Sequence, residues 1–84
     1  MESPATQCFS ARQAEFDAIS EFIETACASL KDDERLRIIL LVEELFANSV
    51  NHGYGGDCDE PVWLSLRVDD QSCRLVYEDR APPY

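Results

Sequence analysis

Three polar side chains stand one helical turn apart in the most apolar stretch of this sequence. Glu44, Asn48 and His52 are spaced i, i+4 and i+8, so on a helix they form one stripe, with Asn51 beside it. A carboxylate and an amide oxygen one turn apart suit Mg²⁺, which takes oxygen ligands and is often completed by substrate phosphates. Glu44 could instead orient or deprotonate a water or hydroxyl beside that ion.

The same residues also have simpler interpretations. The helix pattern alone favours a solvated polar face, and His52 is typical of a helix C-terminus, where the dipole favours a cation. Gly53 and the two glycines after it can stop a helix, although glycine also lets a backbone approach a phosphate closely. With His52, the loop residues Asp57, Cys58 and Asp59 are zinc-type ligands without a paired spacing, which favours a solvated acidic loop.

A further carboxylate, Asp79, ends an alternating run. It is in phase with Cys73, Leu75 and Tyr77, so if that face is the buried one, the carboxylate lies inside at the strand end. A buried carboxylate needs a hydrogen-bond donor. That donor is either an amino group of a ligand or a backbone N–H of the turn that follows.

Two helices are expected before this run. Ser10 with Gln13 fits a capping box, and an apolar stripe at helical spacing predicts an amphipathic helix over Ala11–Ser29. After a break, Asp32 is a candidate N-cap for the next helix. Apolar side chains then cover most of a helix circumference, so we expect Asp33–Asn51 to be the central helix, packed on several sides.

Glycines and alternating patterns organise the rest of the chain. All three glycines lie between residues 53 and 56, where we expect the helix to stop with Gly in the left-handed conformation, followed by a mobile loop over Gly55–Pro61. Alternation over 62–69 and again over 73–78 predicts a β-hairpin, and Gln7–Ser10 is expected to be a short strand. Ala81-Pro82-Pro83 ends strand pairing, because proline has no N–H to donate.

Length and composition bound the architecture. With 84 residues, 45% of them hydrophobic and 29% charged, the chain fits one small globular domain over residues 1–84. A net charge of -10 argues against nucleic acid as a partner. Four cysteines without a C-x-x-C pair, and no leader segment, indicate free thiols in a cytoplasmic protein. The longest apolar run, Ile38–Val42, is too short to cross a membrane.

Two ordered motifs carry a resemblance to a known family. Glu44-Leu45-Phe46-Ala47-Asn48 with His52-Gly53-Tyr54-Gly55, and then Asp79-Arg80-Ala81-Pro82-Pro83-Tyr84, resemble motifs of the GHKL ATPase superfamily. The resemblance covers nearly the whole chain and is closest to the anti-sigma factor serine/threonine kinase branch. It implies an α/β (α+β) two-layer sandwich, with two helices on one face of a mixed or antiparallel sheet.

The resemblance also implies a site for ATP or ADP with Mg²⁺. By likeness to the family, Glu44 is the general base, Asn48 coordinates the Mg²⁺, and Asp79 accepts a hydrogen bond from the adenine amino group. The remaining residues of the implied nucleotide site are His52, Gly53 and Ala81. Ala81 stands where the family motif usually has Gly, which narrows the backbone freedom beside the nucleotide.

The implied function is that of an anti-sigma factor that is also a serine/threonine protein kinase. Such a protein transfers the γ-phosphoryl group to an anti-sigma-factor antagonist and binds a sigma factor. The family domain continues into an ATP lid and a further glycine-rich box, so we expect this chain to be the N-terminal portion of a longer domain, or to be completed by another chain, and to form a homodimer. The alternatives are a non-catalytic module that binds nucleotide or protein, and a dimerisation domain without a ligand.

Overall fold

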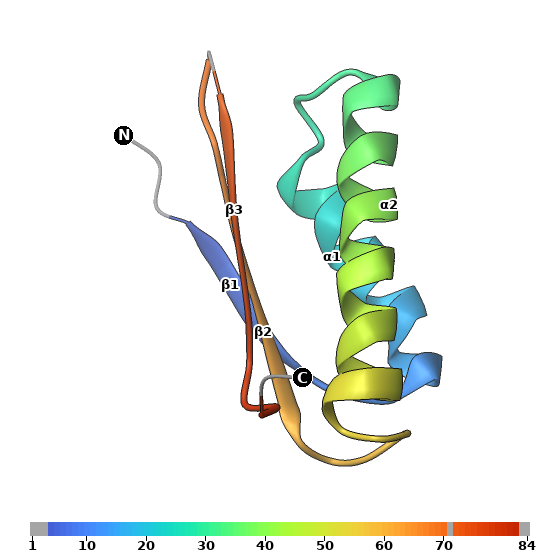
Figure 1. Cartoon of the computed structure of the whole chain (residues 1–84). Coiled ribbons are helices and arrows are strands. Elements are labelled where there is room, and N and C mark those ends of the chain that lie inside the picture. Colours follow the sequence, from blue (N-terminus) through green and yellow to red (C-terminus); the bar gives the residue numbers. More distant parts are fainter. Residues whose placement is uncertain (1–3, 71, 83–84) are drawn as a thin grey trace.

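The structure, a computed structural model, describes residues 4–70 and 72–82. Its elements are β1 (Ala5–Ser10), the 3-10 turn η1 (Gln13–Glu15), α1 (Phe16–Ala26), α2 (Asp32–Asn48), the π turn η2 (Ser49–Gly53), β2 (Pro61–Val68) and β3 (Cys73–Asp79). Both helices lie on one face of a three-stranded sheet (Figure 1). The predicted α+β two-layer sandwich is therefore confirmed, and its sheet is antiparallel throughout.

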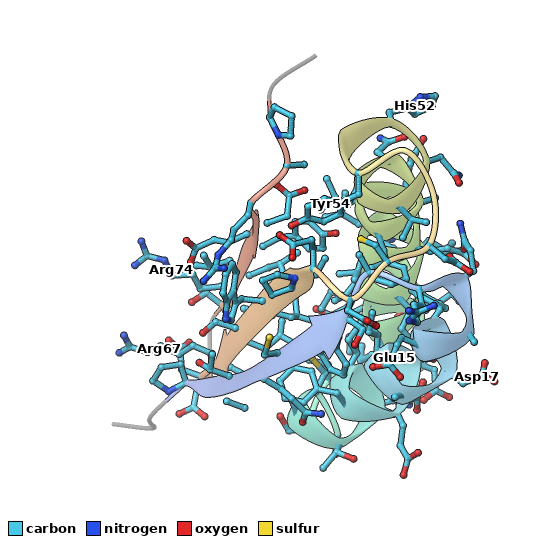
Figure 2. The ribbon with its side chains drawn as sticks, turned by 90° about the horizontal axis from the view of Figure 1, so that it is seen from below. Glu15, Asp17, His52, Tyr54, Arg67 and Arg74 are labelled. Carbon is cyan, nitrogen blue, oxygen red and sulfur yellow. The ribbon has the colours of Figure 1, made fainter. Side chains whose placement is uncertain are left out.

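β2 is the central strand of the sheet. It pairs with β1 from Ala5↔Leu66 to Ser10↔Pro61, and with β3 through the predicted hairpin. Because side chains alternate between the two faces of a strand, every second residue of β2 points to the helices. These inward residues, Val62, Leu64, Leu66 and Val68, are buried. On the opposite face Arg67 lies across from Arg74, and both point away from the helices (Figure 2).

The core lies between the sheet and the two helices. Its helical part is contributed by the buried Ile19, Ile23, Val42 and Phe46. The aromatic rings of Phe16 and Phe46 join the two helices, with ring centroids 6.1 Å apart. Truncating a buried aromatic of this kind to alanine costs about 3–5 kcal/mol. The position of the helix layer therefore depends on a few large side chains.

The first helix is shorter than Ala11–Ser29, because the backbone of Ala11 bonds to a distant loop. The Ala11 N–H donates to the Glu60 carbonyl at 2.9 Å, and the Ala11 carbonyl accepts from the Cys58 N–H at 3.0 Å. The predicted Ser10–Gln13 capping box is wrong. Glu15 takes the expected role of Gln13 and accepts from the Ser10 N–H at 3.3 Å, before α1 begins at Phe16.

The second helix is not packed on several sides as predicted. It buries Val42 and Phe46, whereas Leu36, Leu40 and Leu41 are 51–55% exposed. The reason is its place in the outer layer, where among the described residues the sheet and α1 cover one side only (Figure 1). Asp32 also makes no cap: it is the first helical residue, and its carboxylate bonds to Arg35.

The loop after η2 is held at several points by the segment that precedes α1. The Gln13 N–H donates to Asp57 Oδ1 at 2.9 Å, and the Arg12 guanidinium forms an ion pair with Asp59 at 2.7 Å. Left-handed backbone occurs at Gly55 and Gly56, with φ of 78° and 132°. Within the described ranges, no helix combines the length and apolar character needed to cross a membrane.

The four cysteines are free thiols, in agreement with the sequence prediction. Cys8 is exposed on β1, whereas Cys27 is fully buried at the end of α1, and burial raises the pKa of its thiol to about 11. Because only the thiolate reacts, the accessibility and the pKa of Cys27 both oppose its modification.

We predict that an aromatic disulfide reagent at about pH 8 modifies Cys8 rapidly and leaves Cys27 intact until the protein unfolds. A time course followed by peptide mapping measures both sites. Cys8→Ser should remove the rapid modification at position 8, and denaturant should make Cys27 reactive. Modification of native Cys27 at the rate of Cys8 would contradict the packing of α1 described above.

Candidate functional site

The end of α2 changes its helical geometry at the position of the predicted polar stripe. After Asn48 the chain continues into the π turn η2, in which the Tyr54 N–H donates to the Ser49 carbonyl at 2.8 Å. Such an i→i+5 bond widens the turn, so residues after Asn48 no longer follow the spacing of an α-helix. Figure 2 shows the consequence for His52, which lies at the outer end of the turn with its ring pointing away from the sheet.

A cavity of about 430 Å³ opens between η2 and the end of β3. Its lining residues are Leu45, Asn48, Ser49, Gly53, Tyr77, Asp79, Ala81 and Pro82. The structure therefore brings together most of the predicted nucleotide site: Asn48, Gly53, Asp79 and Ala81. Glu44 and His52 do not line this cavity. Glu44 is exposed on α2, next to the lining residue Leu45 and one turn before Asn48.

Asp79 is exposed where the inner face of the sheet opens into the cavity. Its Oδ1 accepts from the Ala81 N–H at 3.1 Å, which is the backbone donor that the sequence offered as one of two alternatives. Its Oδ2 accepts from the Ser49 hydroxyl at 2.5 Å, a bond that the sequence did not predict. Both oxygens of the carboxylate are thus held by the protein.

Tyr77 and Ser49 lie behind this carboxylate. Their hydroxyl oxygens are 2.8 Å apart, and Ser49 is only 5% exposed. Burial raises the pKa of the Tyr77 phenol to about 12, so the phenol keeps its proton at neutral pH. A protonated phenol can donate as well as accept a hydrogen bond.

Tyr54 braces the segment that forms the cavity wall. Its hydroxyl donates to the Pro61 carbonyl at 2.8 Å and accepts from the Arg80 N–H at 2.7 Å. Burial raises the pKa of the Tyr54 phenol, which keeps it available as a donor. The Arg80 guanidinium lies 5.2 Å from the centre of the Trp63 ring. A cation–π contact of this kind holds Arg80, while its neighbours Asp79 and Ala81 line the cavity.

Gly53 is required by a close contact and not by its backbone angle, since its φ is not positive. A Cβ atom added at Gly53 would lie 2.6 Å from the Cβ of Ala81. Carbon atoms of side chains do not approach so closely, so η2 and the segment after β3 meet here only because one of the two residues has no side chain. The small residues at 53 and 81 therefore fix the width of the cavity together.

A zinc site in the acidic loop is not supported by the geometry. Asp57 and Asp59 are bonded to the segment before α1, and across 4–70 and 72–82 no group of three or more His, Cys, Asp or Glu side chains could hold a metal ion. A divalent cation beside Asn48 would therefore need further oxygens from phosphates and water, which is the usual coordination of Mg²⁺ in nucleotide sites.

Sequence reasoning did not identify Ser49 and Tyr77 as site residues. Ser49 directly follows Asn48 in an apolar helix and is the one buried polar side chain among the described residues. A polar residue at that position was a signal, because buried hydroxyls need partners. The position of Tyr77 was informative for a similar reason. It is in phase with Asp79 on β3, so its hydroxyl lies near the strand end and needs a hydrogen-bond partner there.

Comparison with known proteins gives one family match. The family model for the histidine kinase-like ATPase domain matches residues 9–84. This range includes every residue that lines the cavity. A search of curated proteins finds no match.

We predict that Gly53→Ala destabilises the protein, because the added methyl group would overlap Ala81. The cost is about 1–3 kcal/mol of unfolding free energy, measured by denaturant titration. The double variant Gly53→Ala/Ala81→Gly removes the overlap and should recover most of that loss. Gly53→Ala with wild-type stability, or no recovery in the double variant, would contradict the contact.

Proposed function

The chain belongs to the histidine kinase-like ATPase domain family, and from that premise we propose that it binds an adenine nucleotide with Mg²⁺ in the cavity between η2 and β3. The observation that carries the proposal is the convergence of Asn48, Gly53, Asp79 and Ala81 on this cavity from segments far apart in the sequence. Its volume is within the range of small-molecule sites.

Asp79 is the proposed acceptor for the adenine amino group. Its carboxylate faces the cavity, and each oxygen retains acceptor capacity beyond its bond within the protein. Leu45 and Pro82 supply apolar surface on which a flat base can pack. A base seated there would be fixed by one directional contact and by apolar walls, the usual composition of a small-molecule site.

Asn48 is the proposed magnesium ligand. Its amide lies on the cavity side of α2, and a single amide oxygen suits an ion that keeps several waters and is completed by phosphate oxygens. When bound, Mg²⁺ supplies charge stabilisation of the phosphates. Gly55 and Gly56, which follow η2, leave the backbone of that loop open, since added Cβ atoms there would meet nothing within 4 Å.

We further propose that the activity is phosphoryl transfer to a serine or threonine of an anti-sigma-factor antagonist, by a protein that also binds a sigma factor. In this proposal Glu44 accepts the proton of the acceptor hydroxyl. It is exposed one turn before Asn48, where an acceptor protein can reach it. Its position outside the lining of the cavity favours a second candidate, a regulatory module that binds nucleotide without transferring phosphate.

The first prediction tests nucleotide binding. Titration calorimetry with ADP should show magnesium-dependent binding that Asn48→Ala weakens and that Asp79→Asn reduces by about 10–100-fold, through loss of a hydrogen bond to a charged group. Asn51→Ala is the matched control for Asn48, because Asn51 is exposed and its amide faces Gln13 at 3.5 Å. Glu78→Gln is the control for Asp79. Absence of binding in the wild-type protein would refute the proposal.

The next prediction separates the kinase from the binding module. With radiolabelled ATP and an anti-sigma-factor antagonist, Glu44→Gln should lower phosphate transfer by about 10²–10⁴-fold and leave ATP affinity unchanged. The neighbouring exposed Glu43→Gln is the control. Nucleotide binding without transfer in the wild-type protein would favour the module.

We also propose that the chain forms a homodimer through α2. The support is the exposed apolar face of Leu36, Leu40 and Leu41, each more than half accessible. Light scattering after gel filtration should give the mass of a dimer, and Leu40→Asp should give a monomer. Val76→Asp, which places the same charge at an exposed apolar residue on β3, should leave the dimer intact. A monomeric wild-type protein would contradict this proposal.

A further inference from the structure

Ser49 occupies an unusual position for a hydroxyl in this protein. It is the one buried polar residue of the described chain, and both hydrogen bonds of its hydroxyl group go to side chains of β3. Its backbone N–H is shared between the carbonyls of Leu45 and Phe46, which fixes the Cα at the junction of α2 and η2. The hydroxyl is therefore held between Tyr77 and Asp79 by the fold.

The direction of the hydrogen bonds follows from the number of protons available. A carboxylate only accepts, so the single proton of Ser49 Oγ goes to Asp79 Oδ2 at 2.5 Å. Ser49 Oγ must then accept in its bond with the Tyr77 hydroxyl at 2.8 Å. The raised pKa of Tyr77 keeps its proton in place for this role. The chain of donation runs from Tyr77 to Ser49 to Asp79.

This series of hydrogen bonds leaves the Asp79 carboxylate able to accept further hydrogen bonds but not to donate any. Ser49 holds Oδ2 and the Ala81 N–H holds Oδ1, so the carboxylate cannot rotate without losing a bond. What it offers to the cavity is acceptor lone pairs only. A ligand atom placed there is bound if it is a hydrogen-bond donor and repelled if it is a carbonyl oxygen.

Resting on the proposed nucleotide site, we propose that Ser49 and Tyr77 are positioning residues that set the preference for a purine with an amino group at position 6 over one with a carbonyl. They do so through Asp79 and do not touch the ligand amino group themselves. Ser49 fixes the orientation of the carboxylate, and Tyr77 fixes the orientation of the Ser49 hydroxyl.

The test compares ADP with inosine diphosphate, both with Mg²⁺, by titration calorimetry. The two nucleotides share their phosphates and ribose and differ only along one edge of the base, where inosine has a carbonyl at position 6 and a proton on N1. The ratio of their dissociation constants therefore isolates the contacts of that edge. Ser49→Ala should lower the affinity for ADP about tenfold and the affinity for inosine diphosphate by much less. The reason is that loss of the Ser49 bond frees the Asp79 carboxylate to turn away from the carbonyl at position 6 of inosine. The preference for ADP therefore falls.

Tyr77→Phe should lower the same preference by a smaller factor, about threefold, because it removes only the partner of Ser49. In the Ser49→Ala background it should have no further effect, since its action passes through the Ser49 hydroxyl. If either residue had a merely structural role, its substitution would lower the affinity for both nucleotides equally. The effects of the two substitutions would then add in the double variant.

Ser49→Cys is a control for the loss of packing that Ser49→Ala could cause. It is close in size to serine but donates only weakly, so it should resemble Ser49→Ala in its nucleotide preference while filling the buried position. Ser72→Ala is the matched control, because its hydroxyl also bonds an aspartate, Asp69, but lies at the opposite end of β3. Thermal unfolding by circular dichroism confirms that each variant is folded.

The outcomes distinguish this inference from the proposed function. If ADP does not bind the wild-type protein, the nucleotide site is refuted and this inference with it. If ADP binds and Asp79→Asn weakens it, but the ADP preference is unchanged in Ser49→Ala, Ser49→Cys and Tyr77→Phe, the site stands and the role of Ser49 and Tyr77 is refuted.

Discussion

The inner face of β2 is the surface on which the rest of the molecule is assembled. Its four inward side chains are buried beneath the helices, and its two edges pair with β1 and β3. A strand with alternating apolar residues has one register in which all of them face inward, because a slip of one residue would turn them to solvent. That register determines where β3 ends, and so it places Asp79 opposite the end of α2.

At this end of the molecule the sheet and the helix layer are joined by polar contacts. The Ser49 hydroxyl ties η2 to Tyr77 and Asp79 of β3. The Tyr54 hydroxyl accepts from the Arg80 N–H just after β3, and Gly53 admits Ala81 at close range. A buried hydroxyl such as that of Ser49 costs stability unless it is paired, and it is paired with Tyr77 and Asp79. The cavity walls therefore come from two segments, η2 and the end of β3, which the apolar core alone would not hold together.

The sequence was informative where local patterns decide structure. Alternation identified the hairpin, the two motifs identified the family confirmed by the match, and Asn48, Gly53, Asp79 and Ala81 do meet at one cavity. The errors arose where distant contacts decide: Ala11 bonds to the loop before β2 and not to a helix. The leucines of α2 suggested burial on all sides, and no local pattern signalled the π turn that moves His52 away from Asn48.

The pairing of β1 with β2 carries a consequence for how the chain folds. The β2–β3 hairpin and the α1–α2 pair join segments close in sequence, whereas β1 must meet β2 across both helices, as Ala5 does with Leu66. Closing so long a loop costs chain entropy that local contacts do not. β1 therefore supplies the pairing of longest sequence separation in the sheet, and we expect it to join β2 later in folding than β3 does.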